Sequence, residues 1–194
     1  MGTGVNFECT MCGACCRDEN LLVTVTGSDI SRLSLILGLS ASEVIRALEF
    51  YVLNEGEDVP LGLMHIPQIV TENGPAFIAL KKMENGDCIF LRDNRCMIHV
   101  IRPAVCVSFP FVFKREGDGF SWGFNARKEI CPGLEEGPEV QASDLLSTAQ
   151  KVLEDLAGFQ LFVEDWNRNR PESKARDFID SVLSNPDFSM SKDF

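Results

Sequence analysis

The chain has 194 residues, of which 45% are hydrophobic and 24% are charged, as in an ordinary globular protein with its own core. Its formal net charge of −11 disfavours nonspecific binding to nucleic acid and to anionic lipid, which carry the same sign of charge. No apolar run approaches the roughly 18 residues of a transmembrane helix, and the first residues lack the features of a secretory signal. We therefore expect a cytoplasmic protein without membrane contact.

The stretch from residue 7 to residue 16 is expected to form a loop that holds four of the eight cysteines. Cys9, Cys12 and Cys15 repeat at every third position, which is also the ligand spacing of bacterial ferredoxins, and Cys16 follows directly. Gly13 can adopt a positive φ that lets backbone N–H groups approach a sulfur. Because Cys15 and Cys16 are neighbours, we expect their side chains to diverge, which predicts two sites or one site with a spare thiol.

A strand and two helices are expected next. The apolar residues 21–25 predict a short strand. Polar residues at 28–29 then cap a helix that ends at Gly38. Ser40 begins the pattern of a capping box, which predicts a second helix over roughly 41–53.

Two hairpins are expected between residues 66 and 98. The first turns at Asn73-Gly74, a strong signal for a two-residue turn. The second joins two apolar runs that begin with Cys88 and Cys96, and a four-residue loop would place Cys88 nearer to His99 than to Cys96. Simple alternation does not put these two cysteines on one face, so the sequence leaves open which of them shares a site.

Cys106 and Cys131 follow in segments of irregular structure. Pro103 suits the first position of a helical turn, so Cys106 is expected near that turn's N-terminus, where exposed N–H groups favour a thiolate. A further hairpin over 111–124 separates it from Cys131, which heads a loop with Pro132. We prefer these two cysteines for the ligand positions that the N-terminal loop does not fill.

From about residue 142 the pattern becomes helical. Apolar residues then recur alternately four and three positions apart: Leu145, Ala149, Val152, Leu156, Phe159, Val163 and Trp166. This stripe fits either a coiled-coil dimer seam or a helix packed on its own domain. Its short length, with Gly158 inside, favours the second interpretation. Pro171 ends the helix, and a further short helix is expected over 172–183.

Together these elements predict an α+β fold. Residues 1–138 form a small cysteine-rich, metal-centred domain of short hairpins and helices, and residues 139–194 form a helical extension packed on the same domain. A tight group of cysteines with distant partners predicts that thiolates converge on a soft metal, either zinc or an iron–sulfur cluster. Four disulfides are the disfavoured alternative, because a chain with this core and no secretory signal needs none.

Four segments carry a resemblance to a known family. They are Phe7-Glu8-Cys9-Thr10-Met11-Cys12-Gly13-Ala14-Cys15-Cys16, Cys88-Ile89-Phe90-Leu91, the stretch from Cys96 to Pro110, and Cys131-Pro132-Gly133. In this order they resemble the CxxCxxCC family of zinc- or iron-chelating proteins, also described as Fe–S-cluster-containing proteins. The resemblance covers about residues 7–135 and implies that the cysteines bind metal, without implying a particular reaction. One departure is His99, where the family usually has Tyr.

The leading interpretation is an iron–sulfur protein with one or two four-iron clusters, in a redox or accessory role. The candidate ligands are Cys9, Cys12, Cys15, Cys16, Cys88, Cys96, Cys106 and Cys131. The alternative is a zinc-stapled structural or interaction module, although C-x2-C spacing of the zinc-ribbon kind stands at one end of the chain alone. The partner would be an unknown protein or an electron donor or acceptor, with no nucleic acid, and we expect a monomer or weak dimer.

No catalytic residue is assigned, because neither the C-x3-C-x2-C pattern of radical enzymes nor a clear acid–base pair is present. His99 and His65 are the two histidines of the chain. Imidazole suits zinc and iron, and His99 stands between Cys96 and Cys106, so it is an additional candidate ligand. A single histidine is nevertheless more often an ordinary hydrogen-bonded residue, and this applies most to His65.

Overall fold

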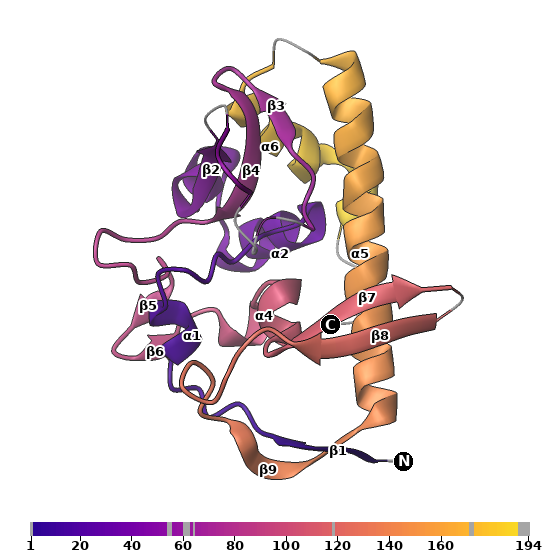
Figure 1. Cartoon of the computed structure of the whole chain (residues 1–194). Helices are drawn as coiled ribbons and strands as arrows, with labels where there is room; N and C mark the ends of the chain where they lie inside the picture. The colour runs from indigo at the N-terminus through magenta and orange to yellow at the C-terminus, as the bar shows by residue number, and fades with distance from the viewer. Residues whose placement is uncertain are drawn as a thin grey trace.

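The computed structural model describes residues 2–53, 56–59, 63, 65–117, 119–170 and 173–189 (Figure 1). In this part of the chain, helices and four small antiparallel sheets form the α+β fold that the sequence predicts. The strands are β1 (Gly2–Phe7), β2 (Leu48–Val52), β3 (Ile69–Thr71), β4 (Gly74–Leu80), β5 (Leu91–Arg92), β6 (Arg95–Cys96), β7 (Phe111–Glu116), β8 (Gly119–Phe124) and β9 (Leu134–Gln141). The helices are α1 (Ala14–Arg17), α2 (Gly27–Leu37), α3 (Ala41–Val44), η1 (Ile45–Ala47), η3 (His99–Ile101), α4 (Ala104–Ser108), α5 (Ala142–Asn169), α6 (Ala175–Ser184) and η4 (Pro186–Phe188).

The hydrophobic core lies between the β2–β4–β3 sheet and the helices α2, α5 and α6 (Figure 1). Phe159 of α5 and Phe178 of α6 are fully buried, and their ring centroids lie 6.3 Å apart in an edge-on arrangement. The buried members of the α5 stripe are Leu145, Ala149, Phe159, Val163 and Trp166. Phe159, Val163 and Trp166 of this stripe belong to the hydrophobic core, as expected for a helix packed on its own domain.

Two elements after the cysteine loop differ from the expectation. Within the described residues, 21–25 contribute a single β-bridge, between Thr24 and Ala79, in place of the expected strand. The capping box at Ser40 is confirmed, but its helix ends at Val44 and the chain continues as η1 and β2. β2 pairs with β4 along its whole length, so this long-range pairing overrides the local helical pattern.

All three expected hairpins are present. β3 and β4 form the expected hairpin, but Thr71 pairs with Gly74, so its two-residue turn is Glu72-Asn73, one position earlier than expected. β7 pairs with β8 in continuous register. β5 and β6 turn through Asp93 and Asn94 alone, whose φ values of 48° and 61° are those of a type I′ turn. This turn pairs Cys96 with Leu91, so the expected four-residue loop is wrong and Cys88 lies before the hairpin.

A strand pair that the sequence did not predict joins the start of the chain to the segment before α5. β1 and β9 run antiparallel, with Gly2 opposite Gln141 and Phe7 opposite Leu134, at the bottom of Figure 1. The acidic residues, glycine and proline at the centre of β9 are poor strand formers, which hid this pair from propensity arguments. The pairing brings the cysteine loop beside the segment that contains Cys131.

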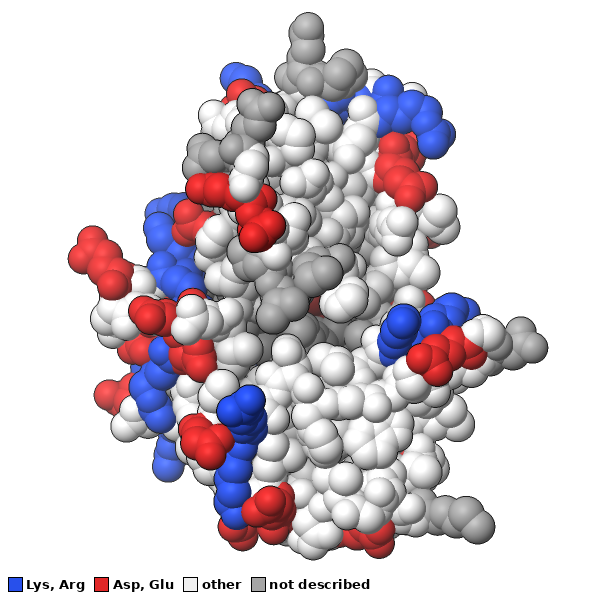
Figure 2. Space-filling view, in the orientation of Figure 1, with Lys and Arg blue, Asp and Glu red and all other residues white. Residues whose placement is uncertain are grey.

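Charge is unevenly spread over the face seen in Figure 2. Charged side chains lie mainly around the edges of this face, and much of its lower part is uncharged. The β7–β8 hairpin leaves Val112, Trp122 and Phe124 partly exposed. No helix among the described residues has the length and apolar character needed to cross a bilayer.

Candidate metal centre

Two backbone hydrogen bonds hold the N-terminal cysteine loop between two other segments of the chain. The N–H of Glu8 donates to the carbonyl oxygen of Gly133 at 3.2 Å, close to Cys131 in the chain. The N–H of Cys88 donates to the carbonyl oxygen of Cys16 at 2.8 Å. The loop therefore closes onto the middle of the chain, and its two ends meet segments that carry different cysteines.

Gly13 lets this loop approach the β5–β6 turn closely. Its φ is 70°, and a Cβ at this position would lie 2.8 Å from the carbonyl oxygen of Asn94. The Gly13 carbonyl oxygen accepts the N–H groups of Cys16 and Arg17 at 3.0 and 3.1 Å, which starts the single turn of α1. Arg17 also donates to the Asn94 side chain at 2.7 Å and to the Cys12 carbonyl oxygen at 3.0 Å. Loop, helical turn and hairpin thus form one unit.

A cavity of about 80 Å³ lies among these elements. The cysteines that line it are Cys9, Cys12, Cys15, Cys16, Cys96, Cys106 and Cys131. Phe7, Phe109 and Ile130 supply apolar walls. Cys88 lies outside this lining and is buried, with its backbone bonded to that of Cys16. Seven of the eight cysteines, scattered along the sequence, thus converge on one space.

The thiols of Cys15, Cys16 and Cys96 interact directly. Hydrogen bonding with the Cys16 thiol lowers the pKa of Cys15 to about 7 and the pKa of Cys96 to about 6, and it raises the pKa of Cys16. The expectation that Cys15 and Cys16 diverge is therefore wrong. Both lie in α1, where successive side chains are about 100° apart, whereas an extended segment would point them to opposite sides. Because the thiolate is the form that binds metal, the lowered pKa values favour Cys15 and Cys96 as ligands near neutral pH.

Burial raises the pKa of both Cys131 and Cys106, and the charges of other thiols raise both further. For Cys131 these thiols include Cys15, Cys9 and Cys12. For Cys106 they include Cys15, Cys88 and Cys96.

His99 and Arg102 line the same cavity. The Nε2 atom of His99 lies 3.8 Å from the Sγ atom of Cys9. Burial, with the positive charge of Arg102, lowers the pKa of His99, so its ring is neutral at neutral pH. After the Cys16 hydrogen bond, the Arg102 charge also lowers the pKa of Cys96. His65, by contrast, is exposed and lies outside the cavity lining.

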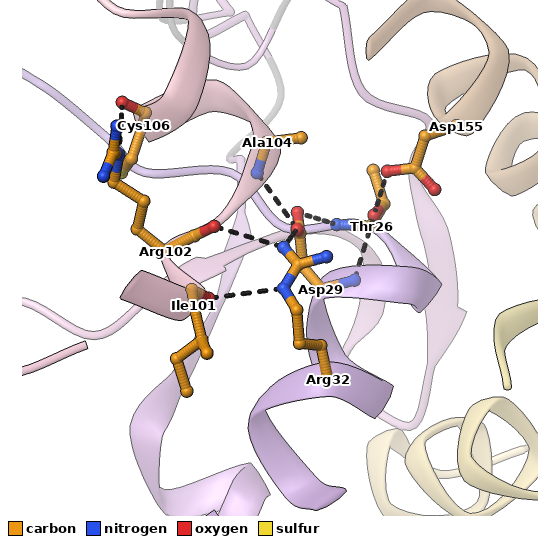
Figure 3. A network of polar contacts seen from close by, with 8 residues as sticks. All are labelled: Thr26, Asp29, Arg32, Ile101, Arg102, Ala104, Cys106 and Asp155. Carbon is orange, nitrogen blue, oxygen red and sulfur yellow. Dashed lines mark hydrogen bonds and ion pairs between the residues drawn. The ribbon is translucent and has the colours of Figure 1, made fainter. Parts of the chain in front are cut away.

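A buried ion pair anchors the segment between β6 and α4 to the core. Asp29 and Arg32 of α2 are 1% and 6% exposed and pair with each other (Figure 3). Arg32 donates to the carbonyl oxygens of Ile101 and Arg102 at 3.3 and 3.2 Å. Asp29 accepts the N–H of Ala104 at 3.0 Å. The position of the α4 cysteine therefore depends on a pair of charges that lies outside the cavity.

Asp29 is also part of the α2 cap. Thr26, rather than residue 28 or 29, is the capping residue: its hydroxyl accepts the N–H of Asp29 at 3.3 Å, and Asp29 accepts the N–H of Thr26 at 3.1 Å. The same hydroxyl donates to Asp155 of α5 at 2.6 Å (Figure 3). Burial raises the pKa of Asp29 to about 6, against the opposing charge of Arg32. Sequence reasoning missed this network, whose one local signal is the Thr-x-x-Asp capping pattern.

The donor set fits a soft metal. Within the described residues, no group of three His, Cys, Asp or Glu side chains is close enough together to hold a metal ion as placed. All eight cysteines are unpaired thiols, and seven of them surround one largely apolar cavity. Thiolates suit zinc and iron–sulfur clusters, whereas magnesium and calcium require oxygen ligands. The residues present therefore fit either zinc or a cluster.

Comparison with protein families matches residues 8–132 to CxxCxxCC, a zinc- or iron-chelating domain. The matched range contains all eight cysteines. No curated protein and no solved structure matches the chain. The family match supports a metal-binding role for the thiols that the fold brings together.

Proposed function

Because the chain belongs to the CxxCxxCC family of zinc- or iron-chelating domains, we propose that its cysteines hold an iron–sulfur cluster in a redox or accessory role. The observation that supports this most is the cavity of about 80 Å³ lined by seven cysteines. A single ion contacts its ligands on all sides, whereas a cluster also needs room for inorganic sulfide. Cys9, Cys12 and Cys15 would supply ligands from one loop. The candidates for the remaining positions are Cys16, Cys88, Cys96, Cys106 and Cys131.

The surroundings of the cavity support the same proposal. Phe7 and Phe109 give the cavity apolar walls, and an apolar shell influences the reduction potential of a cluster. The guanidinium of Arg102 offsets part of the thiolate charge in a chain whose net charge is already −11. These residues would stabilise a cluster without contributing ligands to it.

Zinc is the second candidate, and the contacts between thiols favour it. Cys16 is hydrogen-bonded to the thiols of both Cys15 and Cys96. Two sulfur ligands of one tetrahedral zinc ion, each at about 2.3 Å from the metal, lie about 3.8 Å apart. A pair of these thiols would suit two ligands of one ion, although no three such side chains among the described residues lie close enough together to hold one as placed. In this case the metal centre would be a structural zinc site without redox chemistry.

We place the protein in the cytoplasm, where thiols stay reduced. It would act as a monomer or weak dimer that exchanges electrons with an unidentified protein partner.

Anaerobic purification with metal and sulfide analysis tests the proposal. We expect a brown protein that absorbs visible light through sulfide-to-iron charge transfer and that contains inorganic sulfide in the same amount as iron. A colourless preparation that carries stoichiometric zinc, and that takes up no cluster when supplied with iron and sulfide, would reject the iron–sulfur proposal and support a structural zinc site.

A further inference from the structure

His99 brings a nitrogen donor into the cysteine cavity. It lies in η3, between the cysteine of β6 and the cysteine of α4, and its side chain lines the cavity. Its Nε2 atom lies 3.8 Å from Sγ of Cys9, which stands 90 residues earlier in the sequence. Two metal-binding atoms from distant segments are thus adjacent.

The separation of these two atoms is that of ligands on one metal. A tetrahedral ion with a sulfur at about 2.3 Å and a nitrogen at about 2.0–2.1 Å holds the two ligand atoms about 3.6 Å apart. The observed 3.8 Å between Cys9 and His99 is close to this value. In a four-iron cluster each iron takes one protein ligand, so a pair at this distance suits a single ion or an iron of a two-iron cluster.

Arg102 contacts both ring nitrogens of His99 and its carbonyl oxygen. Its Nη1 atom lies 3.2 Å from Nδ1, 3.1 Å from Nε2 and 2.8 Å from the carbonyl oxygen of His99. These contacts hold the ring in place, as is usual for histidine ligands, and a metal bound at Nε2 would take the place of the Arg102 contact to that atom.

We propose that His99 Nε2 and Cys9 Sγ bind the same metal atom, in the cavity that Cys12 and Cys131 also line. This inference rests on the proposed metal-binding function. Cys12 and Cys131 would complete a set of three cysteines and one histidine, which is an established set for zinc. Mixed cysteine and histidine ligation also occurs in two-iron clusters, where it raises the reduction potential.

The test is spectroscopic and uses the full chain with its native metal. If the metal is iron, pulsed electron paramagnetic resonance of the reduced centre should detect an imidazole nitrogen coupled to the iron. If it is zinc, X-ray absorption should detect a mixed sulfur and nitrogen shell. The nitrogen signal should disappear in His99→Ala and in His99→Cys and should persist in His65→Ala, the matched control on an exposed histidine.

Metal affinity gives a second readout. His99→Ala should weaken metal binding by about tenfold or more, and His99→Cys should retain most of it because it supplies another thiolate. A metal-loaded wild-type protein with sulfur ligands alone would overturn the role of His99 and leave the proposed function standing. A wild-type protein that binds neither iron nor zinc would overturn both. The wild-type spectrum decides the question even if His99→Ala does not fold.

Discussion

The backbone N–H of Cys88 donates to the carbonyl oxygen of Cys16 at 2.8 Å. Cys88 belongs to the hydrophobic core, at 5% exposure, and Cys16 lines the cysteine cavity. The hydrogen bond therefore joins the core directly to the loop that carries half of the candidate ligands. Because those ligands come from distant segments, binding of a metal would stabilise the folded chain as a whole.

Replacing Cys12 with Ser should destabilise the fold as well as weaken the metal centre. If the loss of one ligand lowers metal affinity by about 100-fold, the free energy of unfolding falls by about 2.7 kcal/mol under otherwise saturating conditions. Urea unfolding of wild type and Cys12→Ser, each with and without a chelator, measures this. The two proteins should be equally stable after chelation. A difference that persists in the metal-free proteins would show that Cys12 acts through packing.

The Gly13→Ala substitution should cost more stability than Gly38→Ala. Both glycines have positive φ, at 70° and 65°, so both changes carry the strain of the left-handed region, about 1–2 kcal/mol. A Cβ at Gly13 also meets the Asn94 carbonyl oxygen, whereas a Cβ at Gly38 meets nothing within 4 Å. We therefore expect a further loss of about 1–3 kcal/mol and weaker metal binding for Gly13→Ala alone. Equal losses, with unchanged metal content, would contradict the close approach of the loop to the β5–β6 turn.

Removing the charge of Arg32 should be severe. Arg32→Met leaves the carboxylate of Asp29 buried without its ion-pair partner, which typically costs about 3–5 kcal/mol. Arg176→Met is the matched control, because Arg176 pairs with Asp180 on the surface and its loss should cost under about 0.5 kcal/mol. Chemical denaturation of both variants measures the difference. Similar small losses would show that the buried pair is not important for stability.

The Arg32→Met loss should also depend on pH. The native pKa of Asp29, about 6, lies above the ordinary value of about 3.9 for an unfolded chain, so the native state binds this proton more tightly. The resulting stabilisation is complete below the unfolded pKa and is lost as the pH rises through the native pKa. Without Arg32 the native pKa rises further, so the variant should lose more stability at about pH 7.5 than at about pH 5. A loss that is the same at both pH values would exclude an ionised Asp29 as its cause.

Thiol reactivity in the metal-free protein should follow the pKa shifts. Cys96, with a pKa of about 6, should react with iodoacetamide at a rate that is half-maximal near that pH, whereas burial keeps Cys106 protonated and slow. Mass spectrometry of alkylated peptides over a range of pH measures both rates. Cys16→Ala should move the Cys96 midpoint upward by removing the hydrogen bond. A Cys96 midpoint near that of an ordinary thiol in the wild type would refute this arrangement.

Local patterns predicted a large part of the fold. The β3–β4 hairpin, the β7–β8 hairpin and the helix α5 each follow from patterns of nearby residues, so the sequence alone identified them, although the first turn lies one residue earlier than predicted. β1 and β9 were missed because their partners are far apart in the chain and β9 has a composition unsuited to strands. The helix expected after Val44 was wrong because pairing of β2 with β4 outweighs local propensity.

In the candidate site, too, some features could be predicted from the sequence and others could not. All the cysteines could be identified from their spacing, and the closure of the N-terminal loop followed from having a tight group with distant partners. The contact between Cys15 and Cys16 could not be predicted, since it depends on the one-turn helix that starts at Gly13. The role of Arg32 was equally hidden, because an arginine in sequence gives no sign of whether it is buried.

Mössbauer spectroscopy of the anaerobically purified protein, expressed with the Mössbauer-active iron isotope, tests the central claim most directly. Iron in a sulfide- and thiolate-bound cluster gives a spectrum that differs from that of adventitious iron and reports the type of cluster. We expect nearly all bound iron to show this signature, and we expect it to be lost when Cys9, Cys12 and Cys15 are all replaced by Ser. A protein that folds and carries zinc, with iron absent or present only as nonspecifically bound ions, would contradict the proposal that the cavity holds an iron–sulfur cluster.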